Sequence, residues 1–164
     1  MNAERATCQN QPYAWHVGFE CDAKEMIIML YTIGYTGTKI DDLVAFVHST
    51  NAILCDIRFS PTSRNPVYTK KQLQARFDER YFHLGSLGNR NYRGGPIDIV
   101  DYAKGMRTIE GLLVHWPAAV ILCVCADVTT CHRKGVGEKL SQDLHMRLEH
   151  VSLSRKTAQQ SMLL

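Results

Sequence analysis

The sequence predicts a three-layer α/β fold of the Rossmann-like kind, with about five mainly parallel strands flanked by helices. Short apolar runs alternate with amphipathic segments of helical period across residues 26–153. The clearest run, Ala119–Ala126, is continuous and free of charge, which is typical of a strand buried on both faces. With 164 residues, 45% hydrophobic and 21% charged, the composition excludes a disordered or collagen-like chain.

The first elements are a strand, a helix and a second strand. Met26–Ile33 is a short apolar run that ends at a glycine-containing turn. Thr38 and Asp41 have the spacing of a capping box, so we expect a helix to begin there. Ala52–Ile57 is a second buried strand, and the Ser- and Pro-rich loop over 60–66 ends it.

The later elements continue this alternation. Thr69 and Gln72 form a second capping-box pattern and predict a short helix. Asp98 can cap a longer helix. After the short helix we expect, in chain order, a strand Tyr81–Leu84, a helix from Asp98 to about His115, a strand Ala119–Ala126, a helix His132–Leu144 and a strand Met146–Leu153.

The expected organisation is one α/β domain over 26–153 between two terminal segments. Residues 1–25 mix polar and aromatic residues without a period, which indicates an N-terminal extension, and 154–164 indicate a C-terminal tail. Apolar runs fall short of the roughly 20 residues that cross a bilayer, and no secretory leader is recognisable. We therefore expect no membrane partner and a cytoplasmic location, while the oligomeric state stays open.

The charge pattern predicts an anion site at the carboxyl ends of the strands, where open parallel sheets bind ligands. The chain has a net charge of +3, but residues 56–94 contain eight basic and three acidic residues. Arginine binds phosphate bidentately, and a helix beginning near Cys131 offers free backbone N–H groups. The expected substrate- or phosphate-binding residues are Gly34, Tyr35, Thr36, Arg58, Ser63, Arg64, Asn65, Arg90, Arg93 and Arg133.

Four residues at the same edge are candidates for chemistry. Asp56, Asp127 and His132 can supply acid–base catalysis, although Asp56 beside Arg58 also fits a structural ion pair. Cys131 is either a nucleophile or a structural thiol, because a helix start lowers a thiol pKa.

No metal or other cofactor is expected. Cys123 and Cys125 are placed on one strand, and their spacing to Cys131 matches no usual zinc pattern.

Several motifs resemble the domain-of-unknown-function 488 family, which is related to YeaO-like proteins. They are Thr32–Thr36, Asp56–Pro61, Ser63–Pro66, Tyr81–Gly88, Cys125–Asp127 and Cys131–Arg133. The resemblance runs from about residue 30 to 151 and implies a compact α/β domain without an established activity. The family usually has Glu where this chain has Asp127, which puts any role that needs the longer carboxylate in doubt.

Three functions remain open at this point. The leading hypothesis is a small enzyme that hydrolyses, or transfers a glycosyl group of, a nucleotide or nucleic-acid substrate. The second is a non-catalytic nucleic-acid-binding module in which Tyr68, Tyr81 and Tyr92 stack on bases. The third is a sulfurtransferase-like enzyme that works through Cys131.

Overall fold

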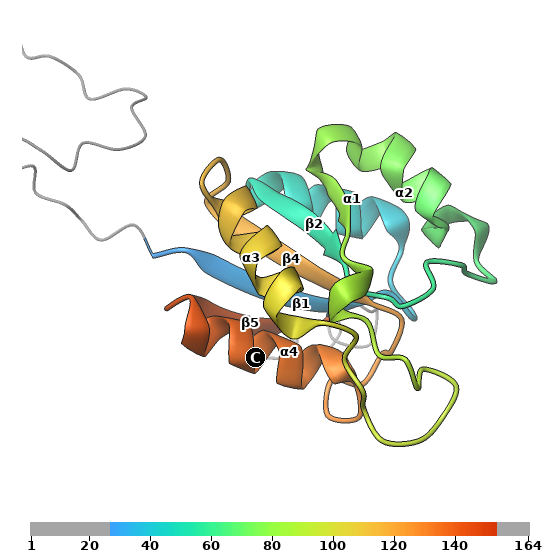
Figure 1. Ribbon diagram of the computed structural model, residues 1–164. Coiled ribbons are helices and arrows are strands. Elements are labelled where there is room, and N and C mark those ends of the chain that lie inside the picture. The colour runs from blue at the N-terminus through green and yellow to red at the C-terminus, as the bar shows by residue number, and fades with distance from the viewer. Residues whose placement is uncertain (1–26, 154–164) are drawn as a thin grey trace, which may run out of the picture.

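The computed structural model describes residues 27–153, so the predicted extension over 1–25 and tail over 154–164 lie outside the described residues. The described part is a five-stranded sheet with strand order β3-β2-β4-β1-β5 (Figure 1). Every paired strand runs parallel to its neighbour. The predicted α/β fold is therefore confirmed.

The strands and helices alternate along the chain. The strands are β1 (Met29–Gly34), β2 (Ala52–Asp56), β3 (Tyr81–His83), β4 (Ala118–Cys123) and β5 (Arg147–Val151). The helices are α1 (Ile40–Ser49), α2 (Lys70–Phe77), α3 (Tyr102–Leu113) and α4 (His132–Asp143). Three single 3₁₀ turns lie between them, at Pro66–Tyr68, Asp78–Arg80 and Gly85–Leu87. None of the helices in this described part is long and apolar enough to cross a membrane.

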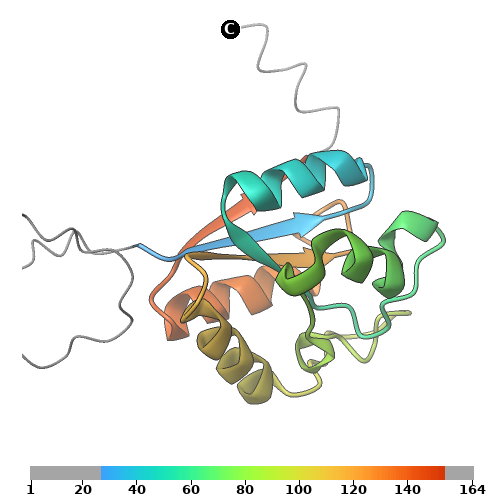
Figure 2. The ribbon, with the colours of Figure 1, turned by 90° about the horizontal axis from the view of Figure 1, so that it is seen from above.

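Two helices cover each face of the sheet, which makes three layers (Figure 2). Leu43 of α1 and Leu73 of α2 pack in one buried cluster, while Ile109 of α3 and Leu140 of α4 pack in the other. All residues of the central strands β2 and β4 are buried. Burial on both faces explains why these two strands are continuous apolar runs rather than alternating patterns.

The predicted helix caps are wrong in detail. The Thr38 hydroxyl donates back to the Gly34 carbonyl at 3.3 Å, and α1 begins without a side-chain cap. The Thr69 hydroxyl likewise donates to the Pro66 carbonyl at 2.9 Å rather than capping α2. Threonine competes in this way for nearby backbone groups, so a capping-box spacing alone does not determine the bond.

The third helix begins later than expected. Its cap is Asp101, whose carboxylate accepts from the Lys104 backbone N–H at 2.9 Å. Asp98 lies before the helix and is engaged by Arg90, with 3.0 Å between Arg90 Nη1 and Asp98 Oδ1. The Asp98 carboxylate, which the sequence predicts to cap the helix, thus forms a salt bridge with Arg90 instead.

Strand β4 is shorter than its apolar run. It ends at Cys123, whereas the sequence predicts a strand to Ala126. The Arg133 guanidinium donates to the carbonyls of Cys125 and Ala126, so these groups do not continue the β-ladder. The chain consequently leaves the sheet three residues early and forms a loop over 124–131 before α4.

Candidate functional site

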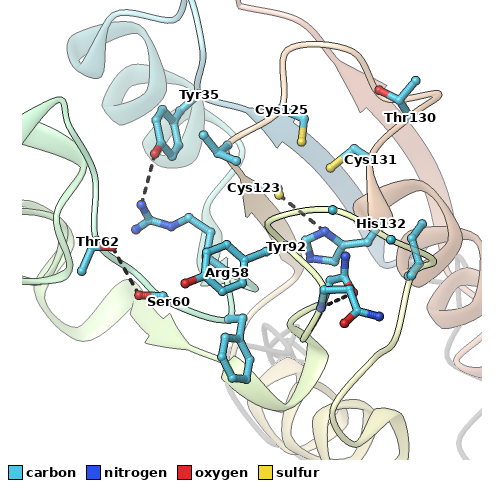
Figure 3. A pocket seen from close by; sticks show the side chains of 17 residues that line it. Tyr35, Arg58, Ser60, Thr62, Tyr92, Cys123, Cys125, Thr130, Cys131 and His132 are labelled. Atoms are coloured by element: carbon cyan, nitrogen blue, oxygen red, sulfur yellow. Dashed lines mark hydrogen bonds between the residues drawn. The ribbon is translucent and has the colours of Figure 1, made fainter.

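A partly enclosed cavity of about 320 Å³ lies at the carboxyl edge of the sheet (Figure 3). Its walls come from the segments after β1, β2 and β4 and from the loop over 89–97. This is the position where open parallel sheets bind ligands. Two predicted binding residues, Tyr35 and Arg58, and two predicted catalytic residues, Cys131 and His132, line it.

A wider, more open groove adjoins this cavity. It has a volume of about 770 Å³ and shares Tyr35, Thr62 and Val124 with the cavity. Besides Tyr35, four more of the predicted binding residues line it: Thr36, Ser63, Arg64 and Asn65. The sequence prediction thus correctly brings the loops after β1 and β2 to one place.

The buried pair Asp56 and Arg58 reaches the cavity through Arg58, which lines it. Arg58 Nε donates to Asp56 Oδ1 at 2.7 Å, and Arg58 Nη2 donates to Oδ2. Tyr81 Oη also donates to Oδ2, at 2.8 Å. Asp56 is fully buried and does not line the cavity. Both of its oxygens are therefore committed to protein donors.

This network changes the protonation behaviour of its members. Burial lowers the pKa of Arg58, but the hydrogen bond and charge of Asp56 outweigh burial and raise it overall. Burial, followed by the Asp56 charge, raises the pKa of Tyr81. The network therefore holds one ion pair with a neutral phenol, as expected for a structural unit in which every charge is compensated.

Four of the predicted anion-binding residues line neither cavity. Arg90 pairs with Asp98, and Arg93 lies over the Tyr92 ring with its Cζ 5.4 Å from the ring centroid. Arg133 is buried and donates to backbone carbonyls. A Cβ on Gly34 would overlap the Cys125 carbonyl oxygen, so this glycine permits a close backbone approach.

The thiols of Cys123, Cys125 and Cys131 converge on one side of the cavity, where their sulfur atoms all lie within 4.8 Å of one another. Cys123 ends β4, Cys125 lies in the following loop and Cys131 is the N-cap of α4. Figure 3 shows the Cys125 and Cys131 side chains close together, with Cys123 beside His132. The expectation that Cys123 and Cys125 share a strand is wrong, because β4 ends at Cys123.

The three thiols affect one another's ionisation. Hydrogen bonds with Cys125 and Cys131, followed by burial, raise the pKa of Cys123. The hydrogen bond from Cys123 lowers the pKa of Cys131 against the effect of burial, and the Arg133 backbone N–H lowers it further. Within the cluster the pKa of Cys123 is therefore raised and that of Cys131 lowered.

His132 connects the thiols with the loop after β2. Its Nε2 lies 3.3 Å from the Ile57 carbonyl oxygen, and its Nδ1 lies 3.8 Å from Cys123 Sγ. A carbonyl oxygen can only accept, so Nε2 carries the proton in that bond. In the neutral ring this leaves the Nδ1 lone pair directed at Cys123.

Asp127 shapes the loop and lines neither cavity. Its Oδ1 accepts from the Thr129 backbone N–H and from the Thr129 hydroxyl, each at 2.8 Å. The backbone bond is the largest of the effects that lower the Asp127 pKa. The carboxylate is exposed and fixes a turn that leads to Cys131.

Aromatic residues in two loops complete the cavity. Phe59 and Tyr92 stack with ring centroids 5.8 Å apart and are about half exposed. Phe59 is absent from the sequence prediction, although an aromatic residue between Arg58 and Ser60 in a strand-end loop is a usable signal. Tyr68 and Tyr81 are 1% and 4% exposed, so the prediction that they stack on bases is wrong.

Comparison with known proteins identifies the family. A family model described as a domain of unknown function, DUF488, matches residues 40–140. No curated protein and no solved structure matches the chain. The matched range includes the loop after β2, the three converging thiols and His132. The chain therefore belongs to the DUF488 family, as its strand-end motifs indicate.

Proposed function

We propose that this chain is a small enzyme that acts on a nucleotide or nucleic-acid substrate at the carboxyl edge of the sheet. The observation that carries the proposal is the junction of a partly enclosed cavity with an open groove. A cavity of about 320 Å³ suits a small planar group. The adjoining groove has room for the sugar and phosphate that such a group carries in a nucleotide.

The two aromatic residues of the cavity wall, Phe59 and Tyr92, favour a substrate with a planar group. Phe59 and Tyr92 present half-exposed rings at the cavity. Nucleobases stack on such rings, and stacking is worth about 1–3 kcal/mol per base. Asn89 and Asn91 also line the cavity, and amide side chains can read the polar edge of a base.

The residues that line the groove favour a substrate with a phosphate group. Lys39 and Arg64 line it, and Thr36 and Ser63 add hydroxyl groups. Arginine and lysine are the usual phosphate-binding side chains. Two other basic residues of the 56–94 segment have partners elsewhere: Arg76 pairs with Asp41, and Arg80 lies over the Trp116 ring.

Acid–base chemistry falls to His132 in this proposal. Its imidazole lines the cavity, whereas neither Asp56 nor Asp127 does, and both Asp56 oxygens accept from protein donors. With Nε2 donating to Ile57, Nδ1 is the nitrogen able to take a proton. Hydrolysis and glycosyl transfer both require such a group, so we keep both reaction types.

The test is binding and turnover of nucleoside monophosphates compared with the corresponding nucleosides. We expect the monophosphates to bind more tightly and Arg64→Ala to remove that advantage. The matched control is Arg107→Ala, which removes one exposed positive charge that lines neither cavity. Equal affinity for nucleosides and nucleotides would contradict the phosphate assignment.

His132→Gln separates catalysis from binding, because glutamine keeps an N–H donor for the Ile57 carbonyl and lacks a titrating nitrogen. Loss of turnover with retained binding supports the enzyme. Binding without turnover in the unmodified chain would leave the binding-module alternative. Turnover of a sulfane-sulfur donor that disappears in Cys131→Ser would favour the sulfurtransferase alternative.

The unpaired thiols of Cys55, Cys123, Cys125 and Cys131 suit a reducing compartment, and we place the enzyme in the cytoplasm.

A further inference from the structure

We propose that Cys123, Cys125 and Cys131 bind one zinc ion on the wall of the cavity, with its fourth coordination position open to the cavity. The inference does not depend on the identity of the substrate. It rests on the convergence of the three thiols and on their position at the cavity.

The sulfur geometry is close to that of a zinc site. Zinc–sulfur bonds of about 2.3 Å in a tetrahedron place the sulfur atoms about 3.8 Å apart. The three Sγ atoms here lie within 4.8 Å of one another. The separations therefore exceed the ideal value by at most about 1 Å, which small rotations of the cysteine side chains can remove.

The loop that supplies the ligands is held at several points. The Tyr35 and Thr36 backbone N–H groups donate to the carbonyls of Cys123 and Val124, at 3.0 and 3.2 Å. The Cys131 backbone N–H donates to the Val128 carbonyl at 3.1 Å. Arg133 fixes the backbone at Cys125 from the other side. Because the loop is already ordered without the ion, it loses less conformational entropy when the ion binds.

The surrounding charge favours a zinc–thiolate centre. Three thiolates around a divalent cation leave one net negative charge. Cys131 is the N-cap of α4, where the helix dipole favours negative charge. The Arg133 guanidinium adds a positive charge, and its buried Nε has no hydrogen-bond partner among the described residues. The same surroundings would oppose a site with a net positive charge.

The open fourth position follows from where the thiols lie. All three cysteines and His132 line the cavity, so a ligand in the cavity can approach the ion directly. Structural zinc sites have four protein ligands, whereas catalytic sites keep one position for water or substrate. His132 lies beside the thiols at the same cavity, with its Nδ1 3.8 Å from Cys123 Sγ.

The test uses the full reduced chain, freed of metal and titrated with cobalt(II), which occupies zinc sites and reports thiolate ligands through its absorption. We expect one cobalt per chain, with a thiolate charge-transfer band and the intense visible bands of tetrahedral cobalt. Zinc added afterwards should displace cobalt and remove these bands. Cyanide, a small ligand, should shift the visible bands because it reaches the open position.

Variants assign the ligands. Cys123→Ser, Cys125→Ser and Cys131→Ser should each weaken cobalt binding at least tenfold. The control Cys55→Ala removes a thiol buried on β2 outside the cluster, and Cys8→Ser with Cys21→Ser removes the two cysteines outside the described residues. Both controls should keep one cobalt per chain. Circular dichroism checks that each variant is folded, and the half-buried Cys125 position is the substitution least exposed to misfolding.

Three results would overturn the proposal. One is the absence of cobalt or zinc binding by the reduced full chain. Another is binding with undiminished affinity in the folded Cys125→Ser variant. The third, a tetrahedral spectrum that does not respond to cyanide, would overturn the open fourth position. Nucleotide binding measured on the metal-free chain is a separate readout, so failure of the zinc site and failure of the proposed function are distinguishable.

Discussion

Two clusters of reactive side chains lie at the carboxyl ends of the neighbouring strands β2 and β4, and they differ in how completely they are satisfied. The β2 cluster joins Asp56, Arg58 and Tyr81 through a buried ion pair and a phenol hydrogen bond. The β4 cluster joins Cys123, Cys125 and Cys131 beside His132, at the cavity. In the β2 cluster, both oxygens of the Asp56 carboxylate are hydrogen-bonded within the protein. In the β4 cluster, the thiols line the cavity and can still bind a ligand.

The difference distinguishes a structural role from a chemical one at the same edge of the sheet. A buried carboxylate whose two oxygens already accept from Arg58 and Tyr81 can accept little from a substrate without losing stability. Thiols and an imidazole at a cavity wall retain the ability to bind, transfer a proton or hold a metal. Proximity to the site is therefore a weaker criterion for function than unused bonding capacity.

The largest expected effect is on stability, from Asp56→Asn. The change leaves the Arg58 charge buried without its counterion, and breaking such a pair costs about 3–5 kcal/mol in the free energy of unfolding. Urea denaturation measures it. The control is Asp98→Asn, which breaks the partly exposed pair with Arg90 and should cost at most about 1 kcal/mol. Equal losses for the two variants would refute the structural assignment of Asp56.

Gly34→Ala should have the next largest effect. Its new Cβ would overlap the Cys125 carbonyl oxygen, a backbone atom that cannot move without displacing the thiol loop. Overpacking of this kind costs about 1–3 kcal/mol, and we expect thiol reactivity of the cluster to change with it. In contrast, Gly111→Ala meets no atom within 4 Å on α3 and should stabilise the chain by about 0.5–1 kcal/mol. A neutral Gly34→Ala would mean that the loop is held less firmly than described.

A smaller effect concerns alkaline pH. Burial and the Asp56 charge raise the folded-state pKa of Tyr81 above that of the unfolded chain, about 10. The stability that this difference contributes is fully present below that pH and is lost as the pH rises further, because only the unfolded phenol then ionises. Tyr81→Phe should therefore flatten the decline of unfolding free energy above about pH 10. An unchanged slope would place Tyr81 outside the network.

The smallest stability change is expected at the cavity wall. Tyr92→Ala and Phe59→Ala alter half-exposed rings, so each should change the free energy of unfolding by about 0.5 kcal/mol or less. Binding of a nucleoside monophosphate should nevertheless weaken by about 1–3 kcal/mol for each stacked base contact removed. Leu112→Ala, on the partly buried side of α3, serves as a control that leaves ligand affinity unchanged. Unaltered affinity in both ring variants would contradict the aromatic wall.

The sequence predicts the fold and part of the site. Charge-free apolar runs identify the central strands, and residues that follow β1 and β2 are correctly brought to one edge. The thiol cluster is not predictable from spacing, because it depends on β4 ending at Cys123 and on the path of the following loop, whose Cys125 and Ala126 carbonyls accept from Arg133. Likewise, the net charge over 56–94 does not show that Arg76 and Arg90 form salt bridges with Asp41 and Asp98. Such pairings depend on the three-dimensional path of the chain, which the count of charges along the sequence does not contain.

The most direct test of the account is a nuclear magnetic resonance titration of the isotope-labelled full chain with a nucleoside monophosphate. The account predicts that backbone signals shift around the cavity and groove, at Phe59, Thr62, Arg64, Tyr92 and His132, and that Tyr92→Ala weakens the response. Shifts confined to the basic face of α2, at Lys70 and Lys71, or no saturable shifts with any nucleoside monophosphate, would contradict it.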